Sequence, residues 1–252
     1  MDTTTVLGLF DREMREHPDT YGSDRVEIVG HVTRVVGEAS WISYSQLDAS
    51  TVQAAIDEQT EFFRQRGTPV EWKVFEHDRP PDLGARLRSA GYLPDPTETL
   101  MAFDLTEALS VAPPPKDVEV RQVRDLQGLA TAVEVSREAF GTGRGWELGS
   151  FSDRLSDPTL GVFVAYAGGK PVSAGRLELP TGRAFASLWG GGTAPEFRER
   201  GIYRALVAAR SKVAREHGFR YLTVDALPTS RPILQRLGFA PLTRMTGWVY
   251  TP

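Results

Sequence analysis

The segment that decides the fold is LWGGGTAPEFRERGIYRAL, residues 188–206, in which a strand gives way to a helix. Three consecutive glycines stand where the strand ends, and glycine weakens a strand unless it marks a bulge or the close approach of another group. Arginines then surround Gly201, after which apolar residues recur with the period of a helix until Gly218. The order predicts a strand with a bulge, a turn and a helix over 201–218.

The start of this helix is a candidate anion site. The first turn of a helix leaves backbone N–H groups unpaired, and the aligned peptide dipoles add partial positive charge, which suits a pyrophosphate. Gly201 lets the backbone turn without a Cβ, and Arg198, Arg200 and Arg204 supply positive charge with forked donors. A solvated, arginine-rich helix start would produce the same pattern, so the loop alone leaves both interpretations open.

Three consecutive prolines at 113–115 indicate a stiff linker, which divides the chain into two expected domains, 1–110 and 117–252. The order of elements at the end of the second half also occurs in the first half. RPPDLGARLRSAGY at 79–92 parallels SRPILQRLGF at 230–239, and each follows a helix and a strand and precedes a further strand. Two such units can look alike by chance, but the shared order favours an internal duplication.

The second domain shows a clear succession of elements. Asp125 is placed to cap a helix that stops at Gly141, and Gly168-Gly169 joins two apolar runs as a hairpin. The other elements expected there are a strand at 118–123, a short helix within 146–158, strands at 183–193 and 219–227, a helix at 230–239 and a strand at 242–251.

The loop after the glycines resembles a known family. TAPEFRERGIYRAL is similar to the acyl-CoA-binding segment of the GNAT superfamily of N-acetyltransferases, which reads roughly V-x-P-x-x-R-G-x-G-x-G-x-x-L. Pro195, Arg198, Gly201 and Leu206 match this segment in register. The likeness extends over about residues 117–252, where the order of the expected elements also agrees with the family.

Three positions depart from the family pattern. Thr193 replaces the usual valine and is nearly isosteric with it. Glu199 replaces the first glycine, so its carboxylate is expected to point away from a diphosphate. Tyr203 replaces the last small residue, where it would narrow the pocket or stack on the cofactor. Backbone donors do not depend on side chains, so the expected anion site survives all three changes.

The resemblance implies an α/β (α+β) fold with two GNAT-like domains, each a mixed, mostly antiparallel sheet flanked by helices. The first half is similar to a degenerate copy, because only DAST separates WISYSQL from its long helix and no arginine-glycine loop is present. Its expected role is to pack against the second domain and shape the acceptor cleft. The glycines at 190–192 would let the pantetheine arm of CoA lie close, unless their bulge merely turns the sheet. The residues expected to bind acetyl-CoA are Gly191, Gly192, Thr193, Arg198, Glu199, Arg200, Gly201, Ile202, Tyr203, Arg204 and Ser230.

The family transfers an acetyl group from acetyl-CoA to an amine by direct attack, which needs a base, an oxyanion donor and a proton for the departing thiolate. Glu178, at the end of an expected strand, is the first candidate base, and Asp225 is the second. A solvated carboxylate at a strand end is the alternative for Glu178. A backbone N–H near Gly192 or Thr193 is expected to polarise the carbonyl.

The proton donor is the weakest part of the resemblance. Many family members have a tyrosine four residues before the Gly-Phe pair of the closing helix, and here that position is Leu234. Ser230, Tyr203 or solvent are the alternatives. The missing tyrosine keeps a non-catalytic acyl-CoA-binding or regulatory protein open as a second function, while the acidic charge balance argues against aminoacyl transfer from tRNA.

Composition narrows the remaining classes. A chain of 252 residues with 40% hydrophobic and 25% charged residues fits a soluble globular protein, and a net charge of -4 argues against a nucleic-acid partner. The absence of cysteine excludes disulfides and thiolate metal sites, and the 4 scattered histidines predict no metal site. No signal peptide or membrane span is expected, so we expect a cytoplasmic enzyme whose acceptor is a small-molecule or protein amine.

Overall fold

The structure is a computed structural model that describes the chain except residues 111, 142–145 and 147–148. It divides into two compact units. Unit 1 comprises Met1–Met101, Ala226–Arg231 and Pro241–Pro252, and unit 2 comprises Ala102–Asp225 and Pro232–Ala240.

These units differ from the expected consecutive ranges 1–110 and 117–252 chiefly at the C-terminus. The last strand, β12 (Ala240–Tyr250), pairs antiparallel with β4 (Val70–Phe75), from Met245 opposite Phe75 to Tyr250 opposite Val70. This pairing groups the end of the chain with unit 1, a long-range contact that sequence order does not reveal.

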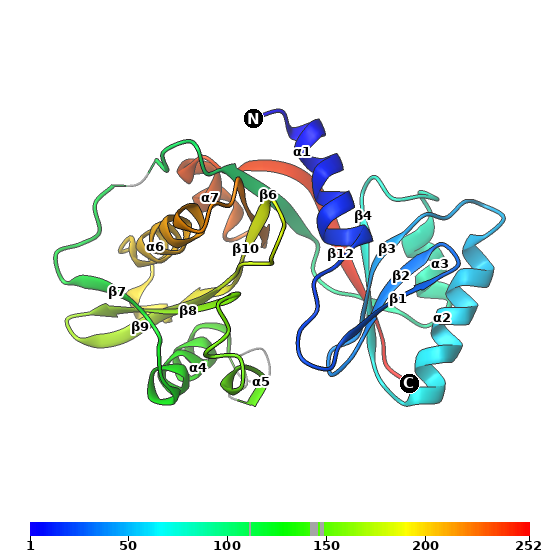
Figure 1. Ribbon diagram of the computed structural model, residues 1–252, viewed down its shortest axis with the longest axis horizontal. Coiled ribbons are helices and arrows are strands. Elements are labelled where there is room, and N and C mark those ends of the chain that lie inside the picture. The colour runs from blue at the N-terminus through cyan, green and yellow to red at the C-terminus, as the bar shows by residue number, and fades with distance from the viewer. Residues whose placement is uncertain (111, 142–145, 147–148) are drawn as a thin grey trace. The chain divides into compact units, whose positions relative to one another are not determined.

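Unit 2 is built on a sheet in the order β11-β10-β9-β8-β7, in which only β10 and β11 run parallel. Helices α4 and α6 cover its two opposite faces (Figure 1). Its elements are β7 (Val118–Gln122), α4 (Leu126–Phe140), α5 (Gly149–Ser152), β8 (Leu160–Ala167), β9 (Lys170–Glu178), β10 (Phe185–Thr193), η2 (Pro195–Phe197), α6 (Ile202–Glu216), most of β11 (Tyr221–Ala226) and most of α7 (Arg231–Leu237).

Several local predictions in unit 2 are confirmed. The Asp125 carboxylate accepts a hydrogen bond of 2.7 Å from the Gly128 N–H and so caps α4, which ends at Gly141. Gly168-Gly169 forms the β8–β9 hairpin, with positive φ at both residues. The helix predicted within 146–158 is much shorter than expected, because after Ser152 the backbone forms turns instead of helical hydrogen bonds. Residues 147–148 of that prediction lie outside the described part of the chain.

Unit 1 contains a sheet in the order β1-β2-β3-β4-β12, with the short β5 paired to β12. Its core packs strand residues such as Ile42 and Trp72 against Ile56 and Phe63 of α2 and Leu87 of α3. The remaining elements are α1 (Thr3–Phe10), the π-helical η1 (Asp11–Glu16), β1 (Arg25–Val29), β2 (Val32–Val36), β3 (Trp41–Ser45), α2 (Val52–Arg66), α3 (Leu83–Ser89), β5 (Leu93–Pro94) and β6 (Glu98–Asp104), which carries the chain into unit 2.

Each unit contains a strand, a helix and a second strand parallel to the first. In unit 1 these are β3, α2 and β4, and in unit 2 they are β10, α6 and β11. The same order of elements therefore occurs twice, as an internal duplication would produce.

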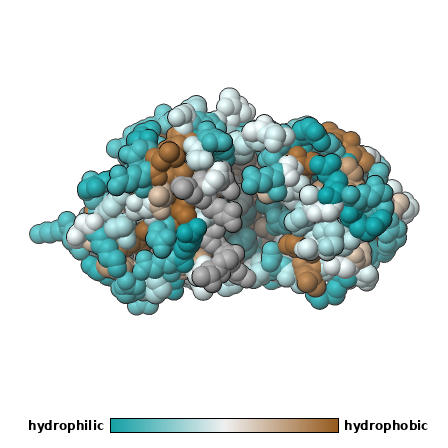
Figure 2. All heavy atoms as spheres, turned by 90° about the horizontal axis from the view of Figure 1, so that it is seen from below, coloured by the Kyte–Doolittle hydropathy of each residue, from teal (hydrophilic) through white to brown (hydrophobic). Residues whose placement is uncertain are grey.

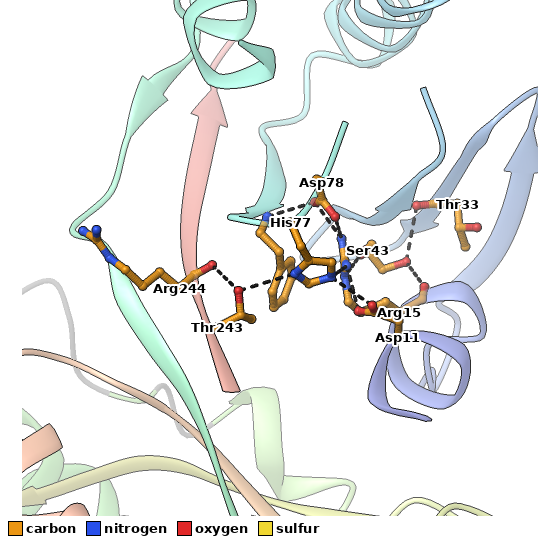
Figure 3. A network of polar contacts seen from close by, with 9 residues as sticks. Asp11, Arg15, Thr33, Ser43, His77, Asp78, Thr243 and Arg244 are labelled. Carbon is orange, nitrogen blue, oxygen red and sulfur yellow. Dashed lines mark hydrogen bonds and ion pairs between the residues drawn. The ribbon is translucent and has the colours of Figure 1, made fainter. Parts of the chain in front are cut away.

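A buried ion-pair network fixes the N-terminal helices of unit 1 (Figure 3). The Arg15 guanidinium donates to both carboxylate oxygens of Asp78, at 2.8 and 2.7 Å, and to Asp11 at 2.8 Å. His77 Nε2 lies 2.9 Å from the other Asp11 oxygen, and the Ser43 hydroxyl donates to the Arg15 carbonyl. Arg15 is buried, and these acidic partners compensate its charge.

The visible face in Figure 2 is mostly hydrophilic or intermediate, with hydrophobic residues confined to small patches. Large apolar side chains that are exposed include Ile28, Leu93 and Leu126. No helix in the described ranges combines the length and apolar character needed to cross a membrane.

Candidate functional site

β10 and β11 are paired only at their beginnings. Parallel pairing joins Phe185–Ser187 to Tyr221–Thr223 and goes no further, although β10 continues to Thr193. On its other side β10 remains paired with β9 up to Ser173 opposite Thr193. The two parallel strands therefore diverge after the first three pairs, and beyond Ser187 the edge of β10 that faces β11 has no strand partner among the described residues. An extended ligand can add to an edge of this kind as a strand would.

The predicted bulge lies in this diverging part of β10. The register with β9 shifts between Trp189 and Gly192, so that two residues of β10 oppose the single residue Gly175. Gly190 has a φ of 53°, in the left-handed region that favours glycine. The bulge predicted from three consecutive glycines is thus confirmed, and it occurs where the parallel strands part.

Two of the three glycines make room for aromatic side chains. A Cβ at Gly190 would overlap the indole of Trp146, and a Cβ at Gly192 would lie 2.7 Å from the ring of Phe140, the last residue of α4. Protein side chains already fill the space that these glycines leave on the α4 face. A ligand arm beside β10 would therefore approach along its open edge and not over this face.

The start of α6 presents backbone donors, as predicted. Gly201 is its N-cap, with φ 82° and ψ 0°, and no side chain caps the helix. The first backbone hydrogen bond into the helix runs from the Ala205 N–H to the Gly201 carbonyl, at 3.1 Å. The N–H groups of Ile202, Tyr203 and Arg204 precede that bond and belong to the unpaired first turn.

Two of the loop arginines have structural partners. Arg198 donates to the Thr193 carbonyl at 3.1 Å and to the Ala139 carbonyl at 2.9 Å, which ties the loop to β10 and to α4. Arg200 forms an exposed ion pair with Asp117, at 3.1 Å. The guanidinium of Arg198 thus holds the loop in shape, and Arg200 could exchange its exposed carboxylate partner for a phosphate at small cost.

Arg204 and Glu199 are two other charged residues of this segment, and both are exposed. Arg204 is exposed, has no ion-pair partner within the described residues, and its guanidinium lies 3.1 Å from where a Cβ on Gly201 would be. Glu199 is exposed and has a φ of 64°, the positive value expected at a position where glycine is usual. Its side chain costs backbone strain at that position, in a conformation that glycine adopts freely.

The geometry of the diverging strands, the bulge and the uncapped helix start can be compared with known proteins. Residues 122–239 match the acetyltransferase (GNAT) family. This part of the chain is a GNAT acetyltransferase domain. No curated protein matches the chain.

Solved structures resemble nearly the whole chain. A GCN5-related N-acetyltransferase from Kribbella flavida is 16% identical, covers 99% of this chain and 94% of its own, and has a TM-score of 0.71. A GCN5-related N-acetyltransferase from Sphaerobacter thermophilus is 15% identical, with coverage of 98% and 91% and a TM-score of 0.67. A tandem GNAT protein from the clavulanic acid biosynthesis pathway is 16% identical, with coverage of 87% and 78% and a TM-score of 0.62. At these identities the likeness shows the fold, which is GNAT-like in the N-terminal half as well.

The two candidate bases of the GNAT domain lie on the same face of its sheet. Glu178 and Thr223 both pair with Ser187, and residues paired directly across strands point to one face. Asp225 follows two residues after Thr223 and so shares that face, just beyond the point where β10 and β11 part. Glu178 is 9% exposed, and Arg154 donates to its carboxylate at 3.0 Å. The structure therefore replaces the solvated-carboxylate alternative for Glu178 with a buried, paired carboxylate.

An aromatic side chain stands beside these carboxylates. Trp189 pairs across the strands with Arg176, two residues from Glu178, so it shares their face of the sheet. Its indole N–H donates to the Ser187 hydroxyl at 2.8 Å. Trp189 is half-buried.

Of the alternative proton donors, Tyr203 lies beside the bulge. Its ring is 3.1 Å from where a Cβ on Gly191 would be, and burial raises the pKa of its phenol. Leu234 is fully buried in α7 and carries no proton to donate. Ser230 belongs to unit 1, where its hydroxyl donates to the Leu227 carbonyl at 3.2 Å, and its role in binding stays a prediction.

In unit 1 the segment between β3 and α2 has the position that the arginine-glycine loop has between β10 and α6 in unit 2. A side chain of this segment, Asp48, binds the backbone N–H groups before α2. The Asp48 carboxylate accepts hydrogen bonds from the N–H groups of Ser50 and Thr51 at 2.8 and 2.9 Å, directly before α2. Hydrogen bonds from the Ser50 and Thr51 hydroxyls and N–H groups hold the pKa of Asp48 at about 2. The aspartate thus places a negative charge of the protein itself at these N–H groups.

Proposed function

We propose that the GNAT domain is an acetyl-CoA-dependent N-acetyltransferase that acetylates a primary amine by direct attack. The observation that carries the proposal is the divergence of β10 from β11 at the bulge, next to the uncapped start of α6. An open strand edge suits the amide-containing pantetheine arm of CoA, and the helix start suits its diphosphate. The two features adjoin along one loop, as a ligand with both groups requires.

The residues divide into those that bind CoA and those that assist the reaction. The amides of Ile202 and Tyr203 would face the diphosphate, with Arg204 adding positive charge. A backbone N–H at Gly192 or Thr193 would polarise the thioester carbonyl. The Ser173 hydroxyl supports this strand end by donating to the Gly192 carbonyl at 2.7 Å.

Acetyl transfer then requires three proton movements. The ammonium of the acceptor must lose a proton before its nitrogen attacks the thioester carbon, and Glu178 or Asp225 would accept that proton directly or through water. When the C–S bond breaks, the CoA thiolate takes up a proton from Tyr203 or from solvent. The nitrogen, which carries an extra proton after its attack, gives that proton back to the same donor. The hydrogen bond of 3.0 Å from Arg154 would hold the Glu178 carboxylate in place for the first of these steps.

A small-molecule amine or a protein amine is the proposed acceptor. Trp189 and the two carboxylates share a face, a combination that favours a cationic group with an apolar neighbourhood. A cytoplasmic location, where acetyl-CoA is available, is part of the proposal.

One observation favours a second function. Leu234 stands where many family members have the tyrosine that protonates the thiolate, so the domain would bind acyl-CoA without turning it over. Two assays separate the functions. Calorimetry with CoA measures binding, and release of free thiol from acetyl-CoA in the presence of an amine panel measures transfer. Binding without thiol release above background would favour the regulatory function, and absence of binding would contradict both.

A further inference from the structure

Arg210 is a buried arginine without an acidic partner. It lies in the middle of α6, is 0% exposed, and forms no ion pair within the described part of the chain. Its Nε donates to the Leu206 carbonyl at 3.2 Å and its Nη1 to the Arg176 carbonyl at 2.9 Å. Its Nη2 is buried and has no hydrogen-bond partner among the described residues.

The other buried arginines behave differently. Arg15 forms a bidentate pair with Asp78, and Arg34 donates to Glu27 at 2.7 Å. In both cases a carboxylate compensates the charge that burial removes from water. Burial lowers the pKa of Arg210 to about 10, so its guanidinium still carries its charge at neutral pH. Arg210 thus holds a charge inside the GNAT domain that no carboxylate of the described residues compensates.

The strands around Arg210 are built to admit its guanidinium. A Cβ on Gly175 of β9 would lie 2.6 Å from Nη1, and a Cβ on Gly191 of β10 would lie 3.1 Å from Nη2. The ring of Tyr203 lies at the same distance, 3.1 Å, from that Gly191 position. Gly175 and Gly191 lie opposite each other at the bulge, and the Arg210 guanidinium occupies the space that a side chain at either position would need.

The hydrogen bond to Arg176 places this cation at the bulge itself. Arg176 pairs with Trp189, the last residue of β10 before the register shifts. The guanidinium therefore holds β9 at the edge of the bulge while its unpaired nitrogen lies against Gly191. An apolar side chain of similar length would fill this space without the cost of burying a charge. The contribution of Arg210 to the stability of the fold therefore does not explain why a charged residue stands at this position.

We propose that Arg210 is a positioning residue for acyl transfer, which fixes the β10 bulge and holds a positive charge behind the backbone of Gly191. The inference rests on the proposed function, because the same stretch of β10 would polarise the thioester carbonyl. Negative charge develops on that oxygen during transfer, and a fixed cation behind the donating strand stabilises it without touching the substrate. Arg210 acts through the strand and does not contact the reacting atoms.

Three variants test this role. Arg210→Met removes the charge and all donors at similar length, and Arg210→Lys keeps the charge. Ser211→Ala is the matched control, because Ser211 is the next residue, is 1% exposed, and donates only to the Val207 carbonyl in the same helix. Thermal melting, CoA affinity by calorimetry, and kcat and KM for thiol release are measured for each variant and the wild type.

We expect Arg210→Met to melt at or above the temperature of Ser211→Ala and to keep CoA affinity within about threefold, while kcat falls by about tenfold or more. Arg210→Lys should recover part of kcat. A merely structural arginine would instead give lower melting temperatures for both Arg210 variants, with kcat per folded molecule unchanged. That result, or a wild-type kcat in Arg210→Met, would overturn the inference while leaving the proposed function intact. A wild-type protein that binds no CoA would contradict the proposed function, and the inference with it.

Discussion

Gly201 offers the sharpest test of the proposed CoA-binding loop, because the same helix carries a matched control. Gly201 at the start of α6 and Gly218 after its end both have a φ of 82°. A Cβ at Gly218 meets nothing within 4 Å, and a Cβ at Gly201 meets only the flexible end of Arg204 at 3.1 Å. Alanine at either position should therefore cost the fold about 1–2 kcal/mol from left-handed strain, in similar amounts.

Substitution by aspartate at the two positions distinguishes an effect on CoA binding from an effect on folding. A carboxylate at position 201 would lie beside the diphosphate, and two unit charges about 5 Å apart repel by about 1 kcal/mol in water and about 3 kcal/mol at an effective dielectric constant of about 20. The dissociation constant for CoA should rise by about 5-fold to about 150-fold in Gly201→Asp. Gly218→Asp should bind CoA as the wild type does, because its carboxylate lies at the other end of the helix.

Calorimetry with CoA at low and high salt measures both variants. The defect of Gly201→Asp should shrink as salt screens the repulsion, since the loop is exposed. Equal affinities of wild type and Gly201→Asp, or an equal loss in Gly218→Asp, would refute the placement of the diphosphate at the start of α6.

Further predictions concern catalysis and stability. Glu178→Gln should lower kcat about 100-fold or more and leave CoA affinity unchanged, and a wild-type kcat across pH would remove Glu178 from the candidate bases. Glu199→Gly should raise the free energy of unfolding by about 1 kcal/mol or less, measured by urea denaturation, because it relieves a positive φ of 64°. Asp78→Ala should lower it by about 3–5 kcal/mol, since Arg15 loses its bidentate partner, and a loss below about 1 kcal/mol would contradict the network. The hydrogen bonds to Asp48 lower its pKa to about 2 in the folded protein, so they stabilise the fold at pH values above the pKa of the unfolded chain. The difference in melting temperature between wild type and Asp48→Ala should therefore shrink as the pH falls from 5 to 2. A constant difference would contradict these hydrogen bonds.

Local signals in the sequence predicted the site's backbone well. The three glycines predicted a bulge, Gly201 predicted the turn into α6, and Asp125 predicted the cap of α4. Each of these features depends on interactions between residues only a few positions apart, so a short stretch of sequence is enough to predict it. The resemblance of the loop to the GNAT family is confirmed by the match over 122–239.

Long-range partners could not be predicted in the same way. The pairing of β12 with β4 joins residues more than 160 positions apart, and no local pattern encodes it. The sequence also contained no sign that the Arg198 guanidinium donates to the carbonyls of Thr193 and Ala139, and its predicted contact with CoA stays a prediction. Arg210 lies on the apolar face of α6 with Ile202 and Leu206, and a charged residue on that face was the one available signal of a buried cation.

A crystal structure with bound CoA tests the central claim most directly. The account predicts a diphosphate at the first-turn amides of α6 and a pantetheine arm along the edge of β10 beyond Ser187. It also predicts no CoA at the loop before α2, because Asp48 occupies the amides there. Density for CoA in unit 1, or in unit 2 away from the start of α6, would contradict the account.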